Sequence, residues 1–144
     1  AHFDPQNLAI TAWAWATLGL LHLPLLDAIA AAAIAKIRQF KTQELNNIAW
    51  AYATLGVRNG PLLAAIASEA ISKIAEFNPQ DIAVTALSFA RLEVADGPLL
   101  DAIAAEAIRK ISSLQPQELG NTSWAFAKLG IAHLPLLQSI AAES

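Results

Sequence analysis

The feature that most constrains this chain is an internal repeat of 37 residues. One block of fourteen residues occurs four times, as QNLAITAWAWATLG from Gln6, QELNNIAWAYATLG from Gln43, QDIAVTALSFARLE from Gln80 and QELGNTSWAFAKLG from Gln117. A second block begins in the same phase with Pro-Leu-Leu, at Pro24, Pro61, Pro98 and Pro135. A fixed period of this length is typical of solenoid proteins, in which each unit covers a face that its neighbour would otherwise expose.

Each block predicts one α-helix, because it is rich in good helix formers and its apolar residues recur at spacings of three and four. We expect the first helix of each unit to start near Pro5, Thr42, Pro79 and Pro116. Asp4 and Asn78 are suitable N-caps, whereas the starts after Lys41 and Gln115 are expected to depend on neighbouring side chains. The second helix is expected to start at each Pro-Leu-Leu.

Glycine is expected to close three of the four first helices in a left-handed conformation, at Gly19, Gly56 and Gly130. Glu93 occupies this position in the third unit, so we expect its turn to differ. The loop that follows carries His22, Asn59, Asp96 and His133 at one equivalent position. We interpret these four as variable residues at a loop tip.

These patterns predict an all-α fold, an α-solenoid of four helix-turn-helix repeats at about residues 4–40, 41–77, 78–114 and 115–144. Hydrophobic residues make up 56% of the chain and charged residues 15%, so each helix is expected to bury more than half of its circumference. Neither end of this single array, residues 1–144, carries the polar cap typical of terminal repeats. We therefore expect a segment of a longer array, or an array capped by a partner.

The sequence predicts neither a membrane span nor an enzyme. Residues 8–26 have the length and apolarity of a span, but Gly19 and Pro24 interrupt them and the equivalent stretches of other units carry charges. Cysteine is absent, and His22 and His133 lie in the first and last units, too far apart to share a metal. With no catalytic motif and no glycine-rich phosphate loop, we predict a non-catalytic protein without metal or cofactor.

Two aromatic series recur along the first helices. The series of Trp15, Tyr52, Phe89 and Phe126 is predicted to pack in the core between layers. The series of Trp13, Trp50, Leu87 and Trp124 lies at the border of the apolar arc. We interpret it as core too, with a stacking platform for nucleic-acid bases as the alternative.

The exposed arc of the first helix varies between units while the rest of the unit stays constant. On a helical projection this wedge comprises Gln6, Asn7, Ile10, Ala14 and Thr17; Gln43, Glu44, Asn47, Ala51 and Thr54; Gln80, Asp81, Val84, Ser88 and Arg91; Gln117, Glu118, Asn121, Ala125 and Lys128. Such a stripe suits a solenoid that reads a linear ligand. The candidate binding residues are Ile10, Thr17, Asn47, Thr54, Val84, Arg91, Asn121 and Lys128.

A row of lysines on the second helices, Lys36, Lys73 and Lys110, has two interpretations. The row could follow a phosphate backbone, or it could belong to a solvated face, because Glu69 and Glu106 precede Lys73 and Lys110 by four residues and favour ion pairs. The second interpretation is the one we favour.

The patterns Q-E-L-x-N-x-x-W-A-x-A-x-L-G and P-L-L-x-A-I-A-x-E-A-I-x-K-I resemble octotricopeptide and heptatricopeptide repeats, as found in algal, dinoflagellate and apicomplexan organelle proteins. The resemblance covers the whole chain and implies a chloroplast or mitochondrial factor that binds single-stranded RNA and controls its stability, processing or translation. It places Asn47 and Asn121 on the family's asparagine. Ile10, Val84, Leu87 and Glu93 depart from the pattern in the first and third units.

Charge argues for a second hypothesis, a protein-binding scaffold or a structural subunit of an organellar complex. The chain has a net charge of −3 and no basic stripe, whereas nonspecific RNA affinity depends mainly on basic residues that neutralise phosphates. Ile10, Leu21 and Leu23 offer an exposed apolar patch for a protein partner. RNA binding predicts a positive surface and a steep salt dependence, and scaffolding predicts neither. DNA is not expected as a partner.

Overall fold

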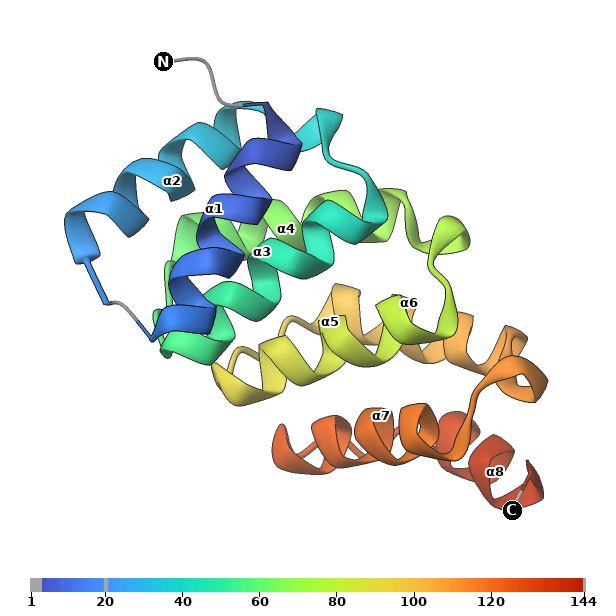
Figure 1. The fold of residues 1–144 in the computed structure, drawn as a ribbon. Helices are drawn as coiled ribbons and strands as arrows, with labels where there is room; N and C mark the ends of the chain where they lie inside the picture. Colours follow the sequence, from blue (N-terminus) through green and yellow to red (C-terminus); the bar gives the residue numbers. More distant parts are fainter. Residues whose placement is uncertain (1–3, 20, 144) are drawn as a thin grey trace.

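The computed structural model describes residues 4–19 and 21–143, which form eight α-helices and no strand (Figure 1). The first helices of the repeats are α1 (Pro5–Leu18), α3 (Thr42–Leu55), α5 (Pro79–Arg91) and α7 (Pro116–Lys128). The second helices are α2 (Leu23–Ala35), α4 (Gly60–Ser72), α6 (Gly97–Arg109) and α8 (Leu134–Glu143). The predicted helical solenoid is therefore confirmed.

The helices form two layers. The most extensive contacts join α1 to α3, α3 to α5 and α5 to α7, and the second helices form a similar, looser series behind them. Figure 1 shows the pairs following one another from α1 and α2 near the N-terminus to α7 and α8 near the C-terminus. Each first helix is thus flanked by the equivalent helices of its neighbours, and the layer of first helices presents one continuous face.

The core lies between the layers and contains most of one predicted aromatic series. Tyr52, Phe89 and Phe126 are at most 2% exposed, as predicted, and Trp15 in the first repeat is half-buried. The Tyr52 hydroxyl donates a hydrogen bond to the Leu26 carbonyl oxygen, and burial, with a smaller contribution from the charge of Asp27, raises the pKa of Tyr52 above its usual range. This phenol is a structural donor within the core.

Short 3₁₀ turns, which the helix periodicity did not predict, connect one repeat to the next. They are η1 (Ile37–Gln39), η2 (Ile74–Glu76) and η3 (Ile111–Ser113), and each ends on a buried apolar residue, Phe40, Phe77 or Leu114. These three residues occupy equivalent positions 37 residues apart. They close the core at the point where the chain passes between repeats.

The helix starts follow the predicted capping chemistry. Asp4 Oδ1 accepts from the Asn7 N–H at 2.8 Å and Asn78 Oδ1 from the Asp81 N–H at 2.7 Å. At the other two starts, Glu44 Oε1 accepts from the Lys41 N–H at 2.9 Å, and Glu118 Oε1 from the Gln115 N–H at 2.7 Å. These starts therefore depend on a neighbouring glutamate in the first turn, as expected.

The turn after the third first helix does not differ from the others, so that prediction was wrong. Glu93 has a φ of 58°, beside 67°, 70° and 72° at Gly19, Gly56 and Gly130. The Val94 N–H reaches the Phe89 carbonyl oxygen at 2.9 Å, and Val57 and Ile131 make the same bond in their repeats. Packing of the repeat determines this turn and keeps a non-glycine residue in the left-handed region.

The variable loop residues have a shared task that we did not predict, because each caps a second helix. The side chains of His22, Asn59, Asp96 and His133 accept from the backbone N–H three residues later, at 3.0 to 3.1 Å. Histidine uses Nδ1 for this bond, so sequence preferences for Ser, Thr, Asp and Asn do not reveal it. The interpretation as variable loop-tip residues therefore missed that each of them caps the helix that follows.

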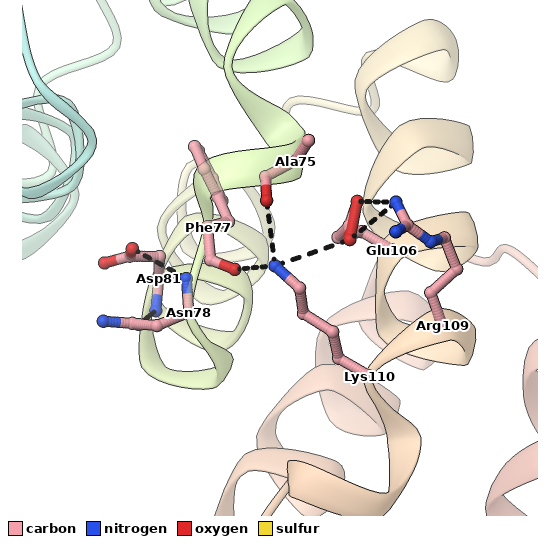
Figure 2. A network of polar contacts seen from close by, with 7 residues as sticks. All are labelled: Ala75, Phe77, Asn78, Asp81, Glu106, Arg109 and Lys110. Atoms are coloured by element: carbon pink, nitrogen blue, oxygen red, sulfur yellow. Dashed lines mark hydrogen bonds and ion pairs between the residues drawn. The ribbon is translucent and has the colours of Figure 1, made fainter.

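Two lysines of the predicted row, Lys73 and Lys110, join neighbouring repeats rather than facing solvent or phosphate. Lys73 Nζ donates to the carbonyl oxygens of Arg38 at 3.0 Å and of Phe40, and lies 3.0 Å from Glu69. Figure 2 shows the same arrangement one repeat later, where Lys110 reaches the carbonyls of Ala75 and Phe77 and the carboxylate of Glu106. The predicted ion pairs are present, but they orient each ammonium group toward the end of the preceding 3₁₀ turn.

Candidate binding groove

A groove of about 420 Å³ crosses the layer of first helices and receives residues from α1, α3, α5 and α7. Its aromatic lining is Trp13 and Trp50, and its amides include Asn47, Gln80 and Asn121. A second hollow of about 320 Å³ shares Asn47 and Gln80 with it. The first helices therefore form one hollowed surface that combines flat apolar rings with hydrogen-bonding amides.

Helical spacing explains why these side chains meet. Asn47, Trp50 and Thr54 lie three and seven residues apart on α3 and so share one face of the helix. The same spacing gives Val84, Leu87 and Arg91 on α5, and Asn121, Trp124 and Lys128 on α7. Because the repeats stack in register, the equivalent faces lie next to one another.

The structure brings some predicted site residues together and leaves others at the edges. Asn47, Val84 and Asn121 line the groove, and Ile10 lies with Asn47 in a neighbouring hollow of about 190 Å³. Four candidates are exposed but not part of the groove lining, namely Thr17, Thr54, Arg91 and Lys128. These four belong to the last turns of their helices, beside the Trp13 series.

The Trp13 series is not core, so that prediction was wrong. Trp13 and Trp124 are each 48% exposed, and Trp50 is half-buried. The alanines Ala49, Ala53 and Ala90 on α3 and α5 are buried, and such small residues allow neighbouring helices to approach closely. The alternative interpretation, a platform of rings open to a ligand, fits Trp13 and Trp50 in the groove.

The exposed wedge is also narrower than predicted. Ala51, Ser88 and Ala125 are completely buried, because a neighbouring first helix covers this arc. Asp81 is 8% exposed and accepts from the Asn46 amide, while the Asn46 carbonyl oxygen accepts from the Thr85 hydroxyl. These three side chains join α3 to α5, and sequence periodicity alone did not indicate the contact.

The remaining acids of the wedge are directed at helix N-termini. Glu44 and Glu118 accept backbone hydrogen bonds in the first turns of α3 and α7, and Asp81 does so on α5 at 3.0 Å from the Asn78 N–H. The partial positive charge of a helix N-terminus stabilises such carboxylates. The helix N-termini therefore offset part of the negative charge that these three carboxylates bring to the grooved surface.

The basic groups near the groove are held by the chain itself. The Arg91 guanidinium lies over the Trp50 ring, 4.8 Å from its centroid, and Lys128 Nζ lies 3.6 Å from Glu93. Arg58 Nε donates to the Leu92 carbonyl oxygen at 2.9 Å. The described residues that line the groove include no Lys or Arg and one acid, Glu118, so a ligand there would meet mainly rings and amides.

Across residues 4–19 and 21–143, no cluster of three or more His, Asp or Glu side chains is arranged to hold a metal ion. None of the helices in this part of the chain is both long and apolar enough to cross a bilayer.

The sequence model of one protein family, described as RNA-editing substrate-binding complex 6 protein (RESC6), matches residues 1–144. The chain belongs to the RESC6 family. The match includes all four repeats, so the groove lies within the region by which the RESC6 family is recognised. No curated protein matches the chain. Membership supports the resemblance to RNA-associated helical-repeat proteins, while the octotricopeptide type stays a prediction.

Proposed function

We propose that this chain is a non-catalytic component of an RNA-editing substrate-binding complex and that its groove binds single-stranded RNA. The observation that carries the proposal is the groove, in which Trp13 and Trp50 lie beside Asn47, Gln80 and Asn121. Proteins recognise single-stranded RNA by stacking its bases on aromatic rings and by hydrogen bonds to base edges. The family description, which names RNA editing and a substrate-binding complex, supports the same function.

Binding in this groove depends on stacking and amide contacts more than on phosphate neutralisation. Arg91 and Lys128 are the two basic residues in the last turns of the first helices, Arg91 lies over the Trp50 ring, and the chain carries a net charge of −3. Each phosphate contact steepens the salt dependence of RNA affinity by roughly one unit of slope. We therefore expect a slope of about one or two, shallower than the steep dependence expected from sequence.

We also propose that the protein acts in an organelle, with the mitochondrion favoured over the chloroplast. Support comes from the family's description as part of an RNA-editing complex and from the resemblance to organellar repeat factors. If the octotricopeptide resemblance is correct, Asn47 and Asn121 contact base edges. Imaging of the tagged protein with organelle markers tests the location.

The test of RNA binding is fluorescence anisotropy with a labelled single-stranded RNA of mixed sequence, at two salt concentrations. Asn47→Ala is expected to alter base preference, measured with homopolymeric RNAs, without changing the salt slope. Ser68→Ala on the exposed face of α4 is the matched control. Duplex RNA and single-stranded DNA serve as competitors, and we expect RNA to be preferred. Affinity no tighter than about 10⁻⁴ M at low salt would reject the proposal.

A protein partner is the second candidate, and the ends of the array favour it. Leu18 is 69% exposed in the first repeat, whereas its equivalent Leu92 is 5% exposed between neighbours. In the last repeat, Leu137 is 43% exposed although its equivalents are buried. Another helix pair of the same type would cover these faces. We propose that the ends bind such a pair, from further repeats or from a partner.

A further inference from the structure

The three junctions between repeats differ in what they place beside the groove. Each pairs a residue of the Trp13 series with the exposed residue at the end of the next first helix. The pairs are Trp13 with Thr54, Trp50 with Arg91, and Leu87 with Lys128. Only the middle pair combines an aromatic ring with a cation, and there the guanidinium lies 4.8 Å from the ring centroid.

We propose that the junction of the second and third repeats is the anchor for the RNA, and that it holds one nucleotide. The base lies against the indole of Trp50 inside the groove, and the guanidinium of Arg91 at its border takes the adjoining phosphate. This inference rests on the proposed RNA-binding function. It predicts one position that binds a nucleotide more tightly than the others, in place of one base bound equally by each repeat.

Arg91 is suited to this task because its side chain is exposed and, among residues 4–19 and 21–143, its recorded contact is the Trp50 ring. It follows Val84 and Leu87 on one face of α5, and both of those residues line the groove. An exposed cation–π contact is weak, so the guanidinium can turn to a phosphate at little cost. Its planar fork also binds phosphate oxygens in a bidentate manner, which the ammonium group of Lys128 cannot do.

The equivalent cation at the next junction is less available. Lys128 lies 3.6 Å from the carboxylate of Glu93, and the ring position there holds Leu87, which has no aromatic face. At the first junction Trp13 offers a ring, but its partner Thr54 carries no charge. Of the three junctions, the one between the second and third repeats is therefore the one that combines an aromatic ring with a cation.

Amide groups at the same junction can form hydrogen bonds with the edge of the base. Asn47 precedes Trp50 by three residues on α3, and Gln80 enters the groove from α5. An amide both donates and accepts hydrogen bonds, as base edges require. Ring, amides and guanidinium therefore come from two adjacent repeats, and neither repeat alone forms the site.

The test uses substitutions that the chain already contains at equivalent positions, so the fold tolerates them. Trp50→Leu copies Leu87 and Arg91→Thr copies Thr54, with Trp13→Leu and Lys128→Thr as the matched controls. We expect Trp50→Leu to weaken binding of a mixed-sequence single-stranded RNA about 5- to 100-fold, the range for losing one stacked base. Trp13→Leu and Lys128→Thr alter the neighbouring junctions of the same groove and should weaken binding clearly less than Trp50→Leu and Arg91→Thr, whereas Ser68→Ala, outside the groove, should leave affinity unchanged. Thermal melting by circular dichroism verifies folding.

The double variant Trp50→Leu/Arg91→Thr decides whether ring and cation form one site. If Trp50 and Arg91 contact the same nucleotide, the effects of the two substitutions on RNA affinity are coupled. The double variant should then bind RNA only slightly more weakly than the single variant with the lower affinity. For Trp13→Leu combined with Arg91→Thr, the two losses of RNA affinity should multiply. Equal losses of RNA affinity from Trp50→Leu and Trp13→Leu would overturn the single anchor. Multiplicative losses from Trp50→Leu and Arg91→Thr would overturn it too, and in both cases RNA binding itself would stand. Absence of binding by the unaltered protein would instead reject the proposed function.

Discussion

Glu93 holds a backbone conformation that three glycines adopt at the equivalent positions. Its φ of 58° costs a residue with a Cβ roughly 1–2 kcal/mol, and its partner Lys128, at 3.6 Å, forms an exposed ion pair that returns little. Its repeat retains the turn because Val94 and Phe89 are bonded across it. The backbone strain is confined to Glu93, so a substitution at this position should relieve it.

We therefore predict that Glu93→Gly stabilises the protein. Glycine relieves the strain but increases the entropy of the unfolded chain, so the net gain should be about 0.5–1 kcal/mol. Urea denaturation monitored by circular dichroism measures it. Ala132→Gly, in the loop after Gly130, is the control and should stabilise nothing. A lower free energy of unfolding for Glu93→Gly would contradict the account of strain.

A buried hydroxyl gives a second prediction at this scale. Thr122 Oγ1 has no hydrogen-bond partner among the described residues, whereas the equivalent Thr85 bonds to Asn46. The residue facing Thr122 from the preceding repeat is Ala83, which stands where the second repeat has Asn46. We expect Thr122→Val to stabilise by about 1 kcal/mol and Thr85→Val to destabilise by a similar amount, measured by chemical denaturation. The same sign for both would refute the argument.

At the scale of elements, a lysine at the end of α4 and another at the end of α6 join these helices to the 3₁₀ turn of the preceding repeat. Lys110 satisfies the carbonyls of Ala75 and Phe77 and lies beside Glu106, a carboxylate that is 3% exposed (Figure 2). Removing the ammonium group takes the hydrogen bond from the part-buried Phe77 carbonyl and leaves the buried Glu106 carboxylate with the exposed Arg109 as its ion-pair partner. Such losses cost more than the hydrogen bonds themselves contribute.

Lys110→Met is accordingly expected to lower the free energy of unfolding by about 2–3 kcal/mol, because methionine keeps the apolar stem but donates no hydrogen bond. Arg38→Met, an exposed side chain on η1, should change it by less than about 0.5 kcal/mol. Thermal melts of both proteins provide the measurement. Similar melting temperatures for the two variants would show that the lysine belongs to a solvated face after all.

Sequence was sufficient for the helices because the 37-residue period is strict, prolines mark most helix starts, and glycines mark the ends of three first helices. It was not sufficient for the 3₁₀ turns, since three-residue turns leave no periodicity, nor for the capping by His22 and His133. The groove shows the same limit. Asn47 and Asn121 were correctly placed on an accessible face, but the exposure of Trp13 depends on how closely neighbouring helices pack, which one helix does not reveal.

At the scale of the whole molecule, the two ends differ from the middle. Leu137 is 43% exposed, while Leu26, Leu63 and Leu100 at equivalent positions are at most 2% exposed. A following repeat would bury this leucine. Solenoids without covered ends tend to associate through them, because each terminal face is complementary to the start of another array.

We predict that the 144-residue chain associates with itself as its concentration rises and that Leu137→Gln weakens this association. The substitution removes apolar area from the outer face of α8. Leu134→Gln is the control, since Leu134 is 64% exposed at a position where two other repeats carry glycine. Sedimentation velocity over a range of concentrations reports the outcome. A chain that stays monomeric throughout would remove the support for end-to-end contacts.

The two kinds of contact between repeats bear on how such an array arises by duplication. The lysine contact recurs unchanged at Lys73 and Lys110, so a copied repeat can be added beside any other and still be fastened. The Asn46, Asp81 and Thr85 contact belongs to one pair of neighbours. Exchanging the second and third repeats would place Asp81 and Thr85 against Ala9, the residue of the first repeat equivalent to Asn46, which has no side-chain amide, so a duplication keeps this contact only when the two repeats are copied together and in order.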